Sequence, residues 1–265
     1  MLTRAQNERI EVVLVSPRNP LNIGAAARAM ANFGLRRLAV VAPYEAHWRE
    51  ARSAVGAPEL LQDAKETRSL TEAVRDCTLV VGTGSLARRK PEQPVVPLPE
   101  LAPLLRQEIA RGGRVALVFG SEKRGLTRQD LSHCHLLAEI PTDPRQPSMN
   151  LGQAVAVCLY EIASRLSESR MPDTGRSAAT EAQTQRGRRT RVDPGDAAGP
   201  ASTRDLELLA GLVEETMLAA NYSPPAMRTA NRHDVHLLLR RLALTRQDAR
   251  RILGLFRRIL WRLKP

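Results

Sequence analysis

The sequence predicts an α/β protein in which helices cover both faces of a mostly parallel sheet, followed by a small helical extension. Over the first 166 residues, short apolar runs with the length of buried strands alternate with helical patterns. This alternation is typical of parallel sheets whose strands are buried on both faces. We therefore expect a first domain at residues 1–166, a flexible linker at 167–203 and a basic helical extension at 204–265.

The elements of the first domain follow from the apolar runs and the helix-start signals along the chain. Strands are expected at Ile10–Val15, Leu38–Ala42, Leu79–Gly82, Val115–Gly120 and Leu136–Ile140. Helices are expected at Leu21–Phe33, Ser69–Cys77, Leu98–Arg111 and Met149–Leu166. Ser69 with Glu72, and Thr127 with Asp130, have the spacing of a capping box, so each pair predicts the start of a helix.

The proposed linker is rich in small and polar residues and contains almost no large apolar side chains. Such a segment cannot bury enough surface to offset the entropy that it would lose on folding. The arginine-rich run at residues 186–191 either contacts phosphate or is simply solvated.

The chain carries a formal net charge of +12, which indicates a polyanionic partner. Residues 228–265 hold much of this excess, with 11 basic and 2 acidic side chains. Aromatic residues make up only 3%, which argues against RNA binding on stacked aromatic platforms. There is neither a membrane-length apolar run nor a signal-peptide core at the N-terminus, so we expect a cytoplasmic protein.

Three scattered cysteines are too few for a disulfide framework. His133-Cys134-His135 resembles a metal cluster, but adjacent side chains do not readily converge on one ion and no second ligand pair lies nearby. We interpret this segment as the approach to a strand, and expect no metal.

Small or polar residues follow several of the expected strands. Asn22-Ile23-Gly24 and Arg28 come after the first strand, Gly82-Thr83-Gly84-Ser85 end the third, and Gly120 to Gly125 follow the fourth. Parallel sheets bind ligands at the carboxyl ends of their strands, and such loops let backbone groups approach a planar ligand. Neither a dinucleotide-binding fingerprint nor a phosphate-binding Walker loop is present.

Three segments, in their order along the chain, resemble the motifs of SPOUT-superfamily RNA 2′-O-ribose methyltransferases. They are Asn22-x-Gly24 with Arg28, then Gly120-x-Glu122-x-x-Gly125, then Pro141 followed by Ser148-Met149-Asn150. The resemblance covers about residues 8–166. It implies S-adenosylmethionine as methyl donor, a trefoil knot near the C-terminal end of the domain, and a homodimer with active sites at the subunit interface. The first motif begins near the N-terminus, so no additional N-terminal RNA-binding domain is expected.

The resemblance also implies roles for individual residues. The catalytic and positioning set is Arg28, Asn22, Glu122, Ser148 and Asn150. The cofactor-binding set is Thr83, Gly84, Ser85, Gly120, Ile140, Ser148 and Met149. Arg28 is the expected catalytic group beside the ribose hydroxyl; it either releases a proton in a special environment or stays charged and orients the hydroxyl or a phosphate. Alternatively, Asn22 and Ser148 cap helices and Glu122 is a surface residue.

The C-terminal block is similar to the helical extension of TrmJ-type enzymes, which methylate the ribose of nucleotide 32 in the tRNA anticodon loop. Thr245 and Asp248 have capping-box spacing, which predicts a helix with an apolar face opposite a row of arginines. That face consists of Ile252, Phe256, Ile259, Leu260 and Leu263. The RNA-contacting set is Arg28, Lys123, Arg124, Arg250, Arg257 and Arg258. The alternative for the arginine-rich face is a solvated or dimer-packing surface.

We therefore predict an S-adenosylmethionine-dependent tRNA 2′-O-ribose methyltransferase that acts as a homodimer, with nucleotide 32 as the expected target. A relative that acts on ribosomal RNA or on another tRNA position is the alternative within the same enzyme class. A non-catalytic RNA-binding protein of the same fold is the alternative outside it.

Overall fold

The computed structural model describes residues 3–84, 91–168, 199–222 and 224–264. Its strands are β1 (Ile10–Val15), β2 (Leu38–Val41), β3 (Lys65–Thr67), β4 (Leu79–Thr83), β5 (Val95–Pro97), β6 (Val115–Phe119) and β7 (Leu136–Glu139). Helices in the first part are α1 (Arg4–Asn7), α2 (Pro20–Asn32), η1 (Trp48–Glu50), α3 (Pro58–Gln62), α4 (Leu70–Ala73), α5 (Leu98–Ala110), α6 (Arg128–Ser132) and α7 (Leu151–Glu168). The extension contains α8 (Thr203–Ala219), η2 (Pro225–Met227), α9 (Arg228–Arg241) and α10 (Arg246–Leu263).

The seven strands of the described chain form one sheet in the order β3-β2-β1-β6-β4-β7-β5, and every neighbouring pair is parallel. β1 lies between β2 and β6, with Val13 opposite both Ala39 and Val118. Because all the strands point the same way, the ends of β1, β4, β6 and β7 lie along one edge of the sheet.

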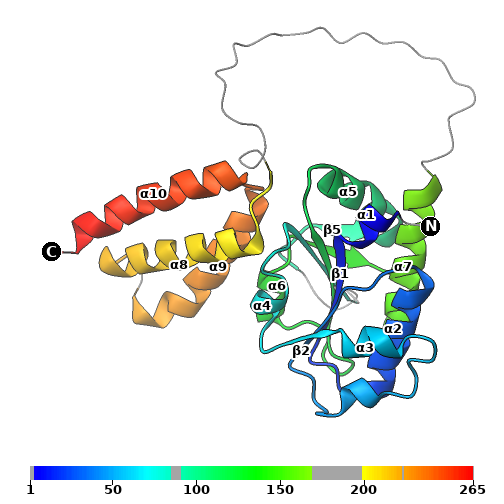
Figure 1. Cartoon of the computed structure of the whole chain (residues 1–265). Coiled ribbons are helices and arrows are strands. Elements are labelled where there is room, and N and C mark those ends of the chain that lie inside the picture. The colour runs from blue at the N-terminus through cyan, green and yellow to red at the C-terminus, as the bar shows by residue number, and fades with distance from the viewer. Residues whose placement is uncertain (1–2, 85–90, 169–198, 223, 265) are drawn as a thin grey trace, which may run out of the picture.

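Successive residues of β1 enter two different cores. Val12 and Leu14 pack in a cluster with residues of α2, α5 and α7, whereas Val13 and Val15 pack in a second cluster with residues of α4. The alternation follows from the two-residue period of a strand, and both sets are apolar because helices cover both faces. Figure 1 shows α2 and α7 on one side of the sheet and α4 and α6 on the other.

All five expected strands are present, and their boundaries agree with the expected ones to within one residue. β3 and β5 were not predicted, because each is only three residues long and neither contains a buried apolar run. Both lie at the edges of the sheet, so their pairing partners define them rather than their own composition.

The expected helices α2, α5 and α7 are present, with α7 starting at Leu151 rather than Met149. α4 is shorter than the expected helix, because it ends at Ala73 and the chain turns before Cys77. Ser69 caps α4, and Thr127 caps α6 in a complete capping box, so both predicted helix starts are confirmed.

The extension has its own small core, in which α8 packs on α9 and α10. Its first helix, α8, begins at Thr203, and Ser202 caps it. Residues 169–198 lie outside the described residues, and with them most of the predicted linker and the arginine-rich run at 186–191. No helix in the described ranges is long and apolar enough to cross a membrane.

Helix α10 begins after Thr245, whose hydroxyl accepts a hydrogen bond from the amide of Asp248, as the capping signal predicted. Its apolar face is only partly the expected one. Ile252 and Phe256 pack on the core of the extension and Leu260 is buried, whereas Ile259 and Leu263 are 39% and 38% exposed. Leu253, which was not among the expected residues of this face, also packs on the core.

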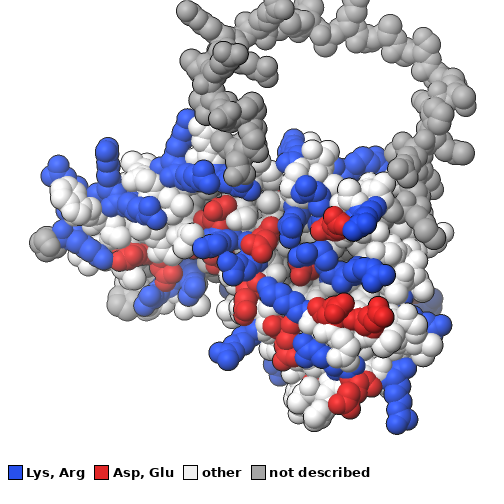
Figure 2. Space-filling view, in the orientation of Figure 1, with Lys and Arg blue, Asp and Glu red and all other residues white. Residues whose placement is uncertain are grey.

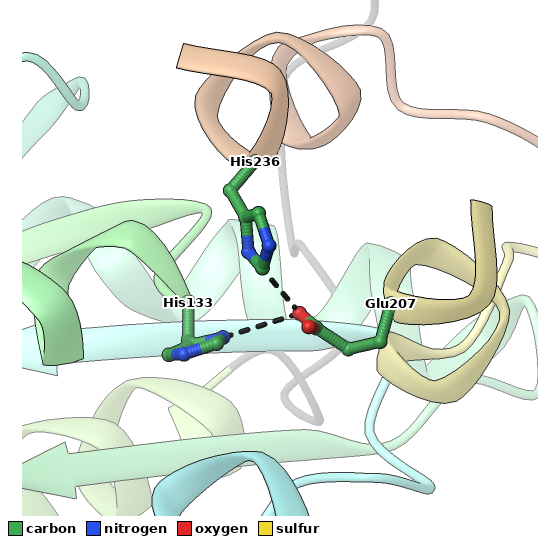
Figure 3. A group of neighbouring side chains, drawn as sticks. All are labelled: His133, Glu207 and His236. Carbon is green, nitrogen blue, oxygen red and sulfur yellow. Dashed lines mark hydrogen bonds and ion pairs between the residues drawn. The ribbon is translucent and has the colours of Figure 1, made fainter. Parts of the chain in front are cut away.

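The extension is joined to the first domain by backbone and side-chain bonds. The amides of Thr203 and Arg204 donate to the carbonyls of Cys77 and Arg75. A buried cluster lies beside them, in which Oε1 of Glu207 is 3.1 Å from Nδ1 of His133 and 2.7 Å from Nη2 of Arg240. Figure 3 shows Glu207 approached by His133 from the first domain and by His236 from α9. We call Glu207, His133, His236 and Arg240 the junction cluster.

The junction cluster is electrostatically balanced by one carboxylate and one guanidinium. Burial alone would raise the pKa of Glu207, but hydrogen bonds from His133 and Arg240 and the nearby histidines lower it to about 2. Burial lowers the pKa of His236 to about 4, so this ring is neutral at neutral pH. The ligand atoms of His133, Glu207 and His236 lie within 4.8 Å of one another. A dication there would face the buried Arg240 guanidinium, so we assign these residues to an ion-paired junction rather than to a metal centre.

Glu207→Gln is expected to weaken docking of the extension by about 3 kcal/mol, because the buried guanidinium of Arg240 loses its counter-charge. Urea unfolding and hydrogen exchange at the amide of Thr203 would measure the loss. Glu215→Gln on the same helix is the control, since the Glu215–Lys264 pair is largely exposed. Equal effects of the two substitutions would contradict a structural role for the junction cluster.

Docking of the extension is also expected to weaken in acid. Released His236 takes up a proton below its ordinary pKa of 6.5, whereas docked His236 resists protonation down to about 4. The stabilisation is therefore complete above pH 6.5 and is lost as the pH falls towards 4; Glu207 adds a further loss between 4.5 and about 2. We expect docking to be about 2 kcal/mol weaker at pH 5 than at pH 7 by hydrogen exchange. His236→Gln should flatten this dependence, and an unchanged slope would show that His236 is not its source.

Candidate active site

The ends of β4, β6 and β7 surround a cavity of about 440 Å³, which we call the strand-end cavity. Thr83 at the end of β4 is buried, and its hydroxyl donates to the carbonyl of Val118 at 3.0 Å, which ties β4 to β6 at the floor. The rest of the wall comes from the loop after β6 and from the segment between β7 and α7.

The loop after β6 depends on two glycines. A Cβ on Gly120 would lie 2.1 Å from the carbonyl carbon of Gly125, so no other residue fits at this position. Gly125 has φ +65°, and its amide donates to the carbonyl of Ser121. This tight loop projects Glu122 towards the loop that follows β1.

Glu122 lies at the surface, in agreement with the alternative that it is a surface residue. Three hydrogen bonds nevertheless fix the position of its carboxylate. It accepts hydrogen bonds from the backbone amides of Arg18 at 2.8 Å and Asn19 at 3.1 Å, and from Nδ2 of Asn22 at 2.9 Å. Partial burial alone would raise the pKa of Glu122, but these hydrogen bonds lower it below its ordinary value. A carboxylate stabilised in this way is a positioning group and a weak proton acceptor.

The hydrogen bonds continue from Glu122 to the start of α7. Oδ1 of Asn22 accepts from Nδ2 of Asn150 at 2.9 Å, and Oδ1 of Asn150 accepts from the amides of Gly152 and Gln153. An ionised carboxylate only accepts, so each amide group has one possible orientation. Glu122, Asn22 and Asn150 thus form a relay with a fixed direction that links all three sequence motifs.

The alternative in which Asn22 and Ser148 cap helices is wrong. Asn19 caps α2 by accepting from the amide of Leu21, and Asn150 fills the same role for α7. The glycine of the first motif has a packing role, since a Cβ on Gly24 would lie 2.2 Å from Oγ of Ser53.

Most of the predicted cofactor-binding set is brought together. Its members that line the strand-end cavity are Thr83, Gly84, Gly120, Ile140, Ser148 and Met149. Ser85 lies outside the described residues. The backbone donors of Arg18 and Asn19 were missed, because a motif records side chains and these two residues act through their amides. Thr142 and Pro147 also line the cavity, and nothing in their residue types indicated it.

Arg28 is separated from the relay. It is exposed on α2, it does not line the strand-end cavity, and no described residue pairs with its guanidinium. Leu21, Ala25 and Arg28 are spaced to share one face of α2. Along this side α2 packs on α7, with Ala25 against Gly152 and Phe33 against Tyr160.

The predicted RNA-contacting residues other than Arg28 fall in two places. Lys123 and Arg124 are exposed at the strand-end cavity, whereas Arg250, Arg257 and Arg258 are exposed on α10. Figure 2 shows lysine and arginine side chains gathered along the α10 side of the extension.

Proteins of known sequence and structure are similar to this chain. A tRNA (cytidine/uridine/adenosine-2′-O-)-methyltransferase TrmJ of Pseudomonas aeruginosa is 42% identical over 156 residues, which are 58% of this chain and 60% of that protein. A tRNA (cytidine-2′-O-)-methyltransferase TrmJ of Methanocaldococcus jannaschii is 38% identical over 160 residues, 59% of this chain and 68% of that protein. The aligned region thus spans somewhat under two thirds of the Pseudomonas protein.

The crystal structure of TrmJ from Z. mobilis ZM4 is similar over 94% of this chain and 98% of its own, with a TM-score of 0.75 and 26% identity. That coverage includes the helical extension. Residues 9–160, which contain the whole relay, match the SpoU rRNA Methylase family. The chain therefore belongs to the SpoU rRNA methylase family.

Proposed function

We propose that the protein is a cytoplasmic S-adenosylmethionine-dependent tRNA 2′-O-ribose methyltransferase, with nucleotide 32 of the anticodon loop as its target. The observation that carries this proposal is the relay of Glu122, Asn22 and Asn150 beside the strand-end cavity. The family, and the activities for which the similar TrmJ proteins are named, support the same reaction.

The strand-end cavity fits S-adenosylmethionine. Its volume of about 440 Å³ lies within the range of small-molecule sites. Gly84 and Gly120 leave backbone groups uncovered at two strand ends, while Ile140, Met149 and Leu151 provide apolar surface for a flat base. When bound there, the cofactor would supply a methyl group on a positively charged sulfur.

The relay would orient the ribose for methyl transfer. Each amide nitrogen of Asn22 and Asn150 uses one hydrogen in the relay, which leaves a second donor on each for the substrate. The lowered pKa of Glu122 keeps the carboxylate ionised, so the relay keeps one direction across the neutral pH range. Holding the hydroxyl oxygen in line with the methyl carbon is the main contribution assigned to these residues.

Arg28 would act in the site of a second subunit. Its face of α2 carries Leu21, which is 54% exposed, and the neighbouring helix α7 carries Val157 and Tyr160, which are 37% and 62% exposed. Exposed apolar side chains on two packed helices favour contact with another copy of the chain. A dimer formed there would bring Arg28 to the partner's ribose, where a charged guanidinium could orient the hydroxyl or a phosphate.

The remaining features of the proposal concern chain path and domains. The proposal includes the trefoil knot that the resemblance to SPOUT enzymes implies near the C-terminal end of the first domain. The basic face of α10 is proposed to contact tRNA, with residues 167–203 as the linker. The family description supports ribosomal RNA as the alternative substrate.

Methyl transfer to unmodified tRNA transcripts, followed by mapping of the modified ribose, tests the proposed activity and its target together. We expect one modified nucleotide at position 32 and binding of S-adenosylmethionine detectable by calorimetry. If only ribosomal RNA were modified, the proposed substrate would have to change from tRNA to ribosomal RNA. An absence of cofactor binding would leave the non-catalytic RNA-binding protein as the better description.

Arg28→Lys is expected to reduce methyl transfer at least about 100-fold and to leave the affinity for S-adenosylmethionine within about twofold, because Arg28 lies outside the cavity. Mixing Arg28→Lys with Glu122→Gln tests the subunit arrangement. If Arg28 serves the partner's site, mixed dimers keep one intact site and about a quarter of the wild-type activity returns. No recovery on mixing would place Arg28 in the site of its own subunit.

A further inference from the structure

A second cavity, of about 890 Å³, lies between the first domain and the extension, and we call it the inter-domain cavity. One wall is the segment 91–93, a second is the loop and helix from Lys123 to Leu131, and His233 of α9 closes the third. Lys123, Arg124 and Leu126 line both this cavity and the strand-end cavity, so the two cavities are adjacent and share part of their wall.

The charged lining of the inter-domain cavity is predominantly positive. Among its described residues are the cations of Lys123, Arg124 and Arg128, and a single carboxylate, that of Glu92. Adjacent cations on a concave surface attract anions, and arginine binds phosphate oxygens through paired donors.

The carboxylate of Glu92 is an anion that already occupies a position beside the cationic groups of this wall. Its Oε1 lies 3.3 Å from Nη2 of Arg128 and 3.2 Å from Nε2 of His233. The hydrogen bond from His233, more than that from Arg128, lowers the pKa of Glu92 below its ordinary value. The side chains of Arg128 and Glu92 are 74% and 50% exposed, so their pair is a weak surface interaction that a phosphate group can replace.

We propose that the inter-domain cavity binds a phosphodiester group of the substrate RNA next to the target nucleotide, with Arg128 and Lys123 as its anion-binding groups. Because the two cavities share Lys123, Arg124 and Leu126, this group would lie beside the nucleotide that enters the active site. His233 makes α9 part of the RNA-binding surface, and Glu92 opposes RNA through its charge. This inference rests on the proposed function, because it takes RNA as the substrate.

The test measures binding of unmodified tRNA transcript by full-length variants over a range of salt concentrations. Arg128→Gln is expected to raise the Kd about 5- to 10-fold and to reduce the slope of log K against log salt by about 1, as loss of one phosphate contact requires. Glu92→Gln is expected to lower the Kd about 2- to 5-fold, since a negative charge leaves the path of the RNA. Arg4→Gln, on exposed α1 and outside both cavities, is the charge-matched control and should stay within about twofold.

The changes in Kd expected for Arg128→Gln and Glu92→Gln have opposite signs, and this difference distinguishes RNA binding from a structural role. If Arg128, Glu92 and His233 only held the extension in place, Arg128→Gln and Glu92→Gln would weaken tRNA binding alike, and this would overturn the inference. Equal affinities of Arg128→Gln and Arg4→Gln would also overturn it. Calorimetry with S-adenosylmethionine on the same samples verifies the fold of each variant. Wild-type protein that binds tRNA but transfers no methyl group would refute the proposed function, whatever the ranking of the variants.

Discussion

The parallel pairing of β1, β6, β4 and β7 is the constraint on which the rest of the structure depends. It brings the ends of four strands to one edge of the sheet, although they are separated by up to about 120 residues along the chain. Strands buried on both faces keep this pairing because a shift of one residue would exchange the contents of the two cores. The strand-end cavity therefore exists only because the sheet is in register.

The carboxylate of Glu122 organises what that edge presents. It accepts from two backbone amides after β1 and from Asn22, and so joins the loop after β6 to the start of α2. Oδ1 of Asn22 in turn accepts from Nδ2 of Asn150, which fixes the side-chain amide of Asn150 in the orientation that caps α7. Since a carboxylate has no hydrogen to donate, one ionised group sets the direction of every hydrogen bond in the relay.

Polar interactions, rather than a shared apolar core, attach the extension to the first domain. Its core is separate from the two cores of the first domain, and contact with that domain runs through backbone hydrogen bonds and the buried junction cluster. Buried ion pairs contribute little net free energy but are strongly directional, so they define a position more than they add stability. The same contact sets α9 beside the loop after β6, and this creates the inter-domain cavity.

The order of elements was predictable from sequence, because apolar periodicity and helix caps are local properties. The strands β1, β2, β4, β6 and β7 and the caps at Ser69, Thr127 and Thr245 were all recognised in this way. Edge strands β3 and β5 were not, since their neighbours define them. The exposed Ile259 and Leu263 show the same limit, because a helical pattern does not say which stripe the neighbouring helix will cover.

At the site, the sequence alone determined which residue types follow each strand and, through their resemblance to a known family, the chemistry that they serve. Tertiary structure decided which of them meet. It joined Asn22, Glu122 and Asn150, left Arg28 on an outer face, and brought His133 to Glu207 across the two domains. The physical reason is that a hydrogen bond between residues about 100 positions apart depends on how the sheet and helices pack, and no local pattern records that packing.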